Sequence, residues 1–233
     1  MANYYQSTLT LRGERKVVEK IFDSIKNEED KRVIDFNKII PMPEELKIDC
    51  TSDPEQIIIL LLHQSHLIGI FGPFSPEVKM AEDIYEKMND ERKKEAEELA
   101  KKYLMNIAKY DYANWYSWSI AKWGTKWNSF NGYSKQHREG DTIFFETANG
   151  FCEPVIEALS KSYPDVEFDY AAADESIGAY TIKGTYKAGK FDGVHEHLTP
   201  AAYEIAFELY PEEKANYHQL EDGTWELNDL KYE

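Results

Sequence analysis

A tryptophan-rich segment is the part of the sequence whose residue types most directly suggest chemistry. Four of the five tryptophans fall between residues 114 and 128, where Gly124 is expected to end a short helix. Tryptophan rings stack on nucleic-acid bases, and a nearby lysine could contact a phosphate. Alternatively, the rings anchor an inserted segment onto a sheet, each burying roughly 150–250 Å². We favour anchoring, because the two lysines of the segment do little to offset the surrounding negative charge. The candidate binding surface here is formed by Trp115, Trp118, Trp123, Lys126, Trp127 and Asn128.

An acidic pair and a histidine pair are the other candidates for chemistry. Asp174 and Glu175 are adjacent in a predicted hairpin loop, where solvated carboxylates are the ordinary outcome. His195 and His197 would project to one side of an extended segment, as two metal ligands do, but no third ligand is evident nearby. An exposed loop is therefore the favoured interpretation, and the sequence predicts neither a metal site nor a cofactor.

The sequence lacks the short motifs that mark common enzyme classes. It contains no P-loop, no Gly-x-Ser-x-Gly, no Gly-x-Gly-x-x-Gly and no cysteine–histidine nucleophile signature. This weakens the case for an enzyme without excluding one. An enzyme acting on a small molecule or nucleotide would use a pocket between the sheet and the insertion, with Lys126, Asn128, Asp174 and Glu175 as its candidate groups.

The chain is strongly acidic, with 27 Lys and Arg against 43 Asp and Glu and a formal charge of −16. Residues 165–233 hold 16 acids and 5 bases, a net of −11, which leaves −5 for the rest of the chain. Such a field repels phosphate backbones, so direct nucleic-acid binding is disfavoured. The acids either solubilise the surface or dock a basic partner in competition with nucleic acid. The candidate acidic patch comprises Glu204, Glu208, Glu212, Glu213, Glu221, Asp222, Glu226 and Asp229.

Cysteine usage and hydropathy indicate the compartment. Cys50 and Cys152 are far apart and have no metal-type spacing, which is typical of thiols in a reducing cytoplasm. The N-terminal residues lack the basic and apolar segments of a signal peptide. The longest apolar stretch, residues 57–62, is far shorter than the roughly 20 residues that span a bilayer. We therefore expect a cytoplasmic protein that does not cross a membrane.

The N-terminal pattern predicts a strand, a helix and a second strand. Residues 4–11 are rich in strand formers, and Gly13 ends that run. Apolar residues then recur at helical spacing between residues 17 and 25. Residues 33–36 resemble a second strand, after which the prolines of residues 39–43 must end any ladder. This order predicts one βαβ unit.

A second βαβ unit is predicted beyond residue 141. Residues 142–147 form the expected strand, Pro154 suits the first turn of the following helix, and Pro164 ends it. Residues 166–170 alternate as a half-buried strand, and residues 178–186 close a hairpin with it. Two βαβ units in succession are the ferredoxin-like pattern, here with an additional hairpin strand.

About a hundred residues separate the two units. Residues 53–70 favour a buried helix, although their β-branched run also permits a strand, and residues 76–110 favour a helix with a solvated Glu/Lys face. A further helix is expected over residues 200–209. The predicted fold class is thus α+β: a ferredoxin-like split βαβ sheet with a long helical insertion between the two units and an acidic C-terminal extension. The predicted boundaries are 1–187 for the ferredoxin-like domain, about 53–130 for the insertion, and 188–233 for the extension.

Three segments carry a resemblance to a known family. Asn-Lys-Ile-Ile-Pro-Met-Pro-Glu-Glu-Leu at residues 37–46, Trp-Tyr-Ser-Trp at 115–118 and Trp-Gly-Thr-Lys-Trp-Asn at 123–128 resemble the YubB-type ferredoxin-like family. The resemblance covers roughly residues 1–187, and the last block is its most specific part. Members usually follow the third strand with Thr-Ala-Trp-Ser-Pro-Pro, whereas this chain keeps only Thr147 and Ala148 before a different sequence with one proline. The resemblance implies the fold and an origin in phages, plasmids or other mobile elements, and it implies no reaction.

The sequence therefore favours binding over catalysis. We expect a mobile-element accessory protein whose partner is a host or element-encoded protein, and a DNA-handling or defence factor with a basic groove is the sharper version of that expectation. The oligomeric state has no signal in the sequence.

Overall fold

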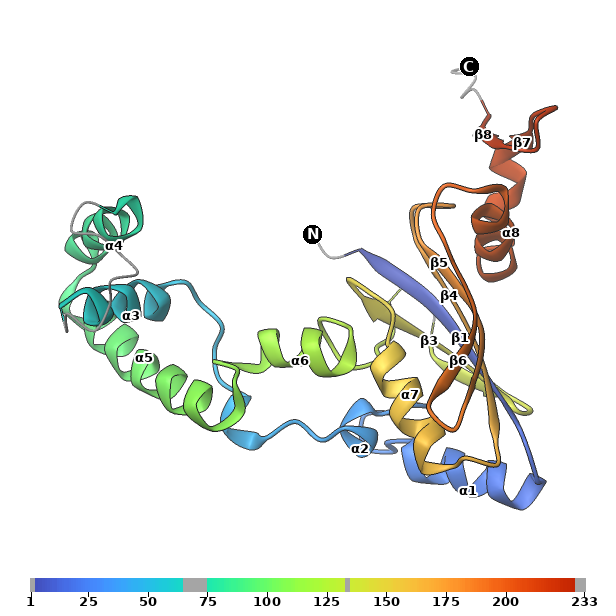
Figure 1. Ribbon diagram of the computed structural model, residues 1–233, viewed down its shortest axis with the longest axis horizontal. Coiled ribbons are helices and arrows are strands. Elements are labelled where there is room, and N and C mark those ends of the chain that lie inside the picture. Colours follow the sequence, from blue (N-terminus) through green and yellow to red (C-terminus); the bar gives the residue numbers. More distant parts are fainter. Residues whose placement is uncertain (1–2, 65–74, 133–134, 229–233) are drawn as a thin grey trace. The chain divides into compact units, whose positions relative to one another are not determined.

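The computed structural model describes residues 3–64, 75–132 and 135–228 (Figure 1). The chain forms two compact units. The first contains residues 1–41 and 119–233, and the second contains residues 42–118. The predicted division placed the insertion at about 53–130, so the second unit begins and ends about eleven residues earlier than expected.

The first unit is built on a six-stranded antiparallel sheet whose strand order is β2-β3-β1-β4-β5-β6. Its elements are β1 (Tyr4–Arg12), α1 (Arg15–Ile25), β2 (His137–Glu139), β3 (Thr142–Ala148), α7 (Glu153–Ser162), β4 (Glu167–Asp174), β5 (Thr181–Lys187) and β6 (Lys190–Glu196). The order β2-β3-β1-β4, with α1 and α7 as its two connecting helices, is the ferredoxin-like arrangement. The predicted ferredoxin-like α+β fold class is confirmed, except for the place of the insertion.

Alternation along the strands separates the two faces of the sheet. On one face, Leu9 and Leu11 of β1 and Tyr170 of β4 are fully buried, and the Tyr170 hydroxyl lies 3.5 Å from Sγ of Cys152 at the start of α7. On the other face, Ala173 of β4 packs in one apolar cluster with Phe207 of α8 (Pro200–Leu209). The helices α1 and α7 therefore cover one face, and α8 crosses the other (Figure 1). We call the face that carries α8 the open face, because α8 covers only part of it.

The strand predicted at residues 33–36 is wrong. The structure places α2 (Phe36–Ile39) there, and the second strand of the first βαβ unit is β2, which begins at His137. Side chains take the place of a neighbouring strand as hydrogen-bond partners: the Val33 N–H donates to Oε1 of Gln136 at 2.8 Å and the Phe36 N–H to Oδ1 of Asn128 at 2.9 Å. Because these partly buried backbone groups already have partners, they are not available to pair with a neighbouring strand. The long insertion therefore follows α1 and precedes β2, so it lies within the first βαβ unit and not between the two units as predicted.

The second unit is helical. Its elements are η1 (Glu44–Leu46), α3 (Asp53–Gln64), α4 (Pro76–Lys87) and α5 (Asp90–Tyr110). The helical alternative for residues 53–64 is confirmed, and residues 65–70 of that prediction lie outside the described residues. Residues 76–110 form two helices rather than one, because Asn89 caps α5 by accepting the Arg92 N–H at 2.8 Å. An apolar cluster of Ile57, Met88, Ala96 and Ala100 holds the three helices together.

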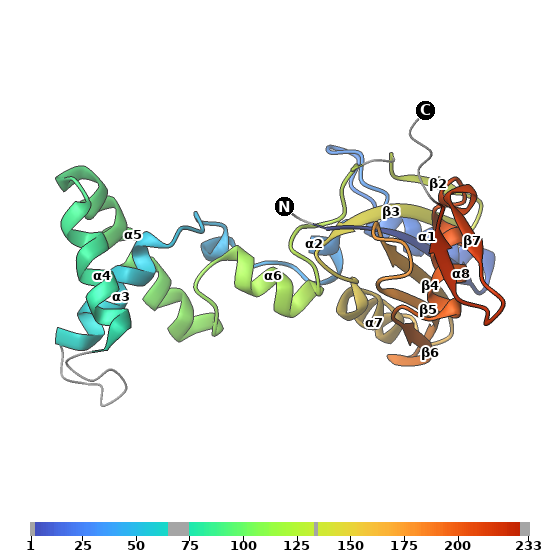
Figure 2. The same cartoon turned by 90° about the horizontal axis from the view of Figure 1, so that it is seen from above.

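Three connecting or terminal features complete the chain. The helix α6 (Trp115–Trp123) runs from the second unit into the first. The sheet continues past the boundary predicted at residue 187, since β6 pairs with β5 along its whole length. The helix predicted at residues 200–209 is confirmed as α8, and it is followed by η2 (Glu213–Asn216) and a hairpin of β7 (Tyr217–Gln219) and β8 (Trp225–Leu227) that the sequence had not revealed (Figure 2).

Candidate functional site

Residues 123–128 connect α2 to the sheet within the first unit, and we call this block the clasp. Trp123 is 4% exposed, its Nε1–H donates to the Ile40 carbonyl at 2.9 Å, and its ring meets Phe36 edge-on at 5.9 Å. Gly124 has φ +78°, and a Cβ there would lie 2.4 Å from the Phe151 carbonyl oxygen, so only glycine fits. The Lys126 N–H donates to the Ala148 carbonyl at the end of β3 at 2.8 Å. The block thus joins α2 to the sheet.

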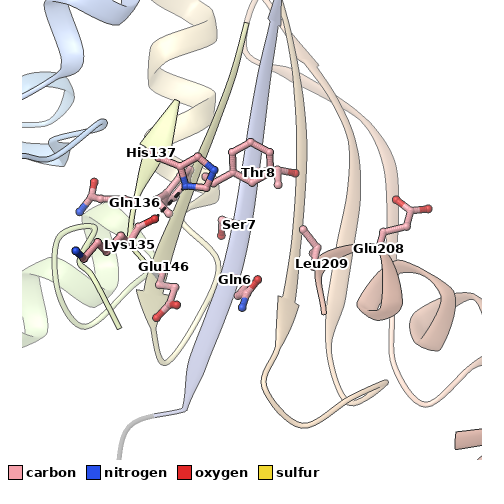
Figure 3. A pocket seen from close by; sticks show the side chains of 11 residues that line it. Gln6, Ser7, Thr8, Lys135, Gln136, His137, Glu146, Glu208 and Leu209 are labelled. Carbon is pink, nitrogen blue, oxygen red and sulfur yellow. Dashed lines mark hydrogen bonds between the residues drawn. The ribbon is translucent and has the colours of Figure 1, made fainter. Parts of the chain in front are cut away.

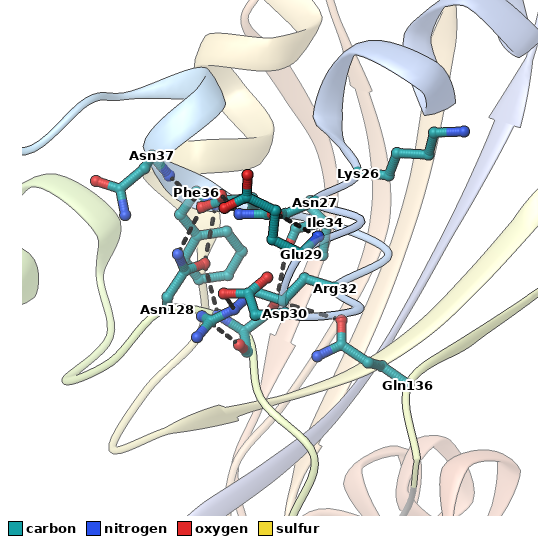
Figure 4. A network of polar contacts seen from close by, with 12 residues as sticks. Lys26, Asn27, Glu29, Asp30, Arg32, Ile34, Phe36, Asn37, Asn128 and Gln136 are labelled. Carbon is teal, nitrogen blue, oxygen red and sulfur yellow. Dashed lines mark hydrogen bonds and ion pairs between the residues drawn. The ribbon is translucent and has the colours of Figure 1, made fainter.

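Asn128 lies at the polar centre of this clasp (Figure 4) and is hydrogen-bonded there to Asp35. The Asn128 Oδ1 accepts the Phe36 N–H at 2.9 Å, and its Nδ2 donates to Oδ1 of Asp35 at 2.6 Å. Asp35 also accepts Nδ2 of Asn27 at 2.9 Å and the Asn37 N–H at 3.0 Å. Burial disfavours the charged carboxylate, but these donors outweigh it and lower the pKa of Asp35 below 3.8. Asn128 is therefore committed to a partly buried structural network.

The tryptophans of the predicted binding surface do not form one face of a single unit. Trp115 and Trp118 belong to the second unit, where Trp118 is buried, whereas Trp123 and Trp127 belong to the first. Trp127 is 37% exposed, and the Lys126 ammonium lies 4.8 Å from its ring centre. This pair is the accessible part of the predicted surface within the first unit.

The expectation that Asp174 and Glu175 are solvated is wrong for Asp174, which is 1% exposed at the end of β4. Its carboxylate accepts the Ser176 N–H at 2.7 Å and Nδ2 of Asn3 at 3.3 Å. Burial and the Asp174 carboxylate together raise the pKa of Tyr5. Glu175 accepts the Tyr4 N–H at 3.1 Å. Both carboxylates hold the start of β1, because β1 and β4 are neighbours in the sheet.

A cavity of about 110 Å³ lies on the open face, between the edge formed by β2 and the end of α8 (Figure 3). Gln6, Glu146, His137 and Leu209 are among its lining residues. Glu146 is 2% exposed, and a Cβ added to Gly132 would overlap its Oε2, so the loop at Gly132 covers the carboxylate. The His137 ring stacks on Phe144 at 4.6 Å. Sequence reasoning missed Glu146, because a polar residue inside a strand carries no sign of how deeply its face is covered.

The C-terminal acids lie on α8, on the hairpin of β7 and β8 that packs against it, and on the segment between them. Phe207 of α8 meets Trp225 of β8 at 4.9 Å and Tyr217 of β7 at 5.6 Å, which fixes the hairpin on the helix. Of the predicted patch, Glu213 is partly buried and Asp229 lies outside the described residues. The exposed members are Glu204, Glu208, Glu212, Glu221, Asp222 and Glu226. We call these six residues the acidic surface.

The histidine pair does not form a metal site with the groups around it. The Nε2 of His195 lies 3.0 Å from Oε1 of Glu153, and the ring of His197 stacks on Tyr180 at 4.4 Å. His195 lies on β6 rather than in the loop that the sequence favoured. In the described part of the chain, no three His, Cys, Asp or Glu side chains come together as metal ligands. None of the described helices has the length and apolar character needed to cross a membrane.

Comparison with known proteins locates the domain in the sequence. Residues 122–196 match the family described as the ferredoxin-like domain in Api92-like protein. Among solved structures, protein Api92 from Yersinia pseudotuberculosis aligns with 85% of this chain and 99% of its own, at 8% identity and a TM-score of 0.37. No curated protein matches the chain. Residues 122–196, which run from the clasp to the end of β6, are thus similar to the ferredoxin-like domain of Api92-like proteins.

Proposed function

We propose that this chain is an accessory protein of a phage or other mobile element and that it acts by binding another protein. The observation that carries the binding role is the acidic surface on α8 and the β7–β8 hairpin. Residues 196–228 hold eight Asp or Glu and one Lys, so the surface is strongly negative. The resemblance of the 123–128 block to the YubB-type family supports the mobile-element origin.

The partner that suits this surface is a basic protein, such as a host or element-encoded DNA-handling or defence factor. A rigid negative surface attracts a positive groove, and long-range charge raises the rate of encounter. Only one exposed acid of the surface has a direct cationic partner among the described residues: Glu208 accepts Nζ of Lys183 at 2.6 Å. Most of the surface charge therefore stays available for a partner.

The alternative, an enzyme for a small molecule or nucleotide, has weaker support. Two of its candidate groups, Asn128 and Asp174, are engaged in partly buried hydrogen bonds that hold the fold. The open-face cavity is lined by the buried Glu146 carboxylate and by His137, yet its volume of about 110 Å³ is well below the roughly 300–1,000 Å³ of ordinary ligand pockets. The cavity suits a structural role or a very small ligand better than a nucleotide.

Affinity capture from a host lysate tests the proposal with three forms of the protein. One variant neutralises the acidic surface (E204Q, E208Q, E212Q, E221Q, D222N and E226Q). The matched control neutralises six exposed acids of α4 and α5 (E82Q, D83N, E86Q, E91Q, E95Q and E98Q). We expect the partner to be lost from the first variant and from the wild type at high salt, because screening shortens electrostatic reach to about 3 Å at 1 M. A partner retained equally by all forms at both salt concentrations contradicts the proposal.

A further inference from the structure

The strand β6 is a long edge of the sheet. Its seven residues pair with β5 on one side, and the sheet order places β6 last. The opposite edge, β2, has three residues. Most of β6 is exposed, and Val194 is 46% exposed. Natural sheets usually shorten or cover their edges, so a full-length, exposed edge strand is a ready template for another strand.

The backbone of β6 presents hydrogen-bonding groups to the outside. Ala188 and Gly189 both have positive φ, which makes the β5–β6 connection a two-residue turn. In an antiparallel ladder, pairs that exchange hydrogen bonds alternate with pairs that do not. Gly184 and Gly193 are of the second kind, since a Cβ on Gly184 would lie 2.6 Å from the Gly193 Cα. By alternation, the N–H and C=O groups of Phe191, Gly193 and His195 are directed away from β5.

A groove of about 600 Å³ lies beside this edge, on the face covered by α7. Its lining includes Glu153 and Glu157 from α7, Tyr186 from β5 and Phe191 from β6. The rings of Tyr186 and Phe191 pack at 4.7 Å. The Tyr186 hydroxyl donates to Oε2 of Glu153 at 2.7 Å, so the carboxylate is held at the groove wall by a buried phenol.

The chemistry of the groove is complementary to a cation. Aromatic faces and a carboxylate together attract ammonium and guanidinium groups. Glu157 pairs with the Lys161 ammonium, whereas Glu153 has no lysine or arginine partner among the described residues, so Glu153 is the main anionic group. The other oxygen of Glu153 lies 3.0 Å from Nε2 of His195. On the open face, the same strand presents Asp192 and Glu196 together with Lys190, so two carboxylates and one ammonium lie along the edge.

We propose that an extended segment of the partner protein adds to β6 as a seventh strand and places a lysine or arginine side chain in the groove beside Glu153. Main-chain hydrogen bonds to the edge would supply affinity, and the groove would select the basic residue. The inference rests on the proposed protein-binding function and names the mode of binding: the occupant is an extended basic segment of another chain.

Peptide binding tests the mode directly. The probe is a peptide of about nine alternating threonines and valines with a central lysine. Two controls replace the lysine with norleucine or methylate alternate backbone nitrogens. We expect amide NMR shifts centred on residues 191–195, no binding of the methylated peptide, and affinity for the norleucine peptide lowered by about tenfold.

Variants of the protein sharpen the same test. Glu153→Gln keeps the size of the side chain and should weaken the lysine peptide about tenfold while leaving the norleucine peptide unchanged. Glu167→Gln, whose wild-type carboxylate pairs with Lys187 at 3.0 Å, is the matched control and should change neither affinity. The proposal is overturned if the methylated peptide binds equally, if the shifts fall elsewhere, if no peptide binds, or if β6 pairs with a second copy of this chain in solution.

The acidic-surface variant separates this proposal from the proposed function. If the partner is captured through the acidic surface while the lysine peptide fails to bind, the mode of binding is wrong and the function stands. If the peptide binds β6 while no partner depends on the acidic surface, the proposed function is wrong and the edge site stands.

Discussion

Replacing Asn128 with alanine should unfold the clasp, because this side chain makes hydrogen bonds to the start of α2 and to the residue that follows the clasp. The Asn128 side chain accepts the N–H groups of Phe36 and Ser129, each at 2.9 Å, and donates to Asp35 at 2.6 Å. A neutral hydrogen bond contributes about 1 kcal/mol, and one to a charged group about 1.5–3 kcal/mol. The three bonds together predict that Asn128→Ala lowers the free energy of unfolding by about 4 kcal/mol.

Equilibrium unfolding in urea, followed by tryptophan fluorescence, measures this loss. Trp123 is a suitable reporter because it is buried beside Phe36. Asn128→Asp should lose at least as much stability near neutral pH, since a second carboxylate would face Asp35, and part of that loss should be recovered in acid. Lys20→Ala, at an exposed position of α1, is the control and should change stability by less than about 0.5 kcal/mol.

A loss below about 1 kcal/mol for Asn128→Ala would refute the assignment of this residue to the fold. If such a stable variant also failed to capture the partner, the 123–128 block would be a contact surface after all. The measurement therefore decides between the two interpretations of the tryptophan-rich segment.

Three further outcomes follow from the burial of particular groups. Burial raises the pKa of the Cys152 thiol to about 12, so a disulfide reagent near neutral pH should modify the exposed Cys50 alone in the folded protein and both cysteines in urea. The pKa of Asp35 is lower in the folded protein than its ordinary 3.8, so its contribution to stability is present above that pH and is lost as the pH falls through the folded value. Asp35→Asn should therefore be less stable than the wild type near neutral pH but should lose less stability on acidification, as urea titrations across this range will show. Phe207→Ala removes the buried ring that packs against Trp225 and should lower the free energy of unfolding by about 3–5 kcal/mol. The variant should detach the β7–β8 hairpin and reduce partner capture without changing the charge. Unchanged capture and an unchanged unfolding midpoint would contradict that role.

The sequence predicted the fold more accurately than it predicted the surroundings of the candidate site residues. Asp174 and Glu175 looked like an exposed pair, yet Asp174 is buried because β4 continues to it and β1 lies alongside. Glu146 had no distinguishing pattern, since its burial depends on the loop at Gly132 and on α8 crossing the open face. The Glu153–Tyr186 contact joins residues 33 positions apart on two elements. Such sites depend on which helices and strands pack together, and this packing cannot be predicted from the spacing of residues along the sequence.

The sequence by itself determined the elements whose residues face one environment along their length. The strand at residues 4–11, the helix at 200–209 and the end of α6 at Gly124 all followed from periodicity or from a residue with a unique conformational role. Only the tertiary structure decided that residues 33–36 are not a strand. It also decided that β2 is a strand, although the three residues of β2 are exposed and show no apolar alternation. The physical reason for β2 is that a short edge strand is formed by pairing with its neighbour, here β3. Residues 33–36 form no strand because side chains of Asn128 and Gln136 already accept their backbone N–H groups.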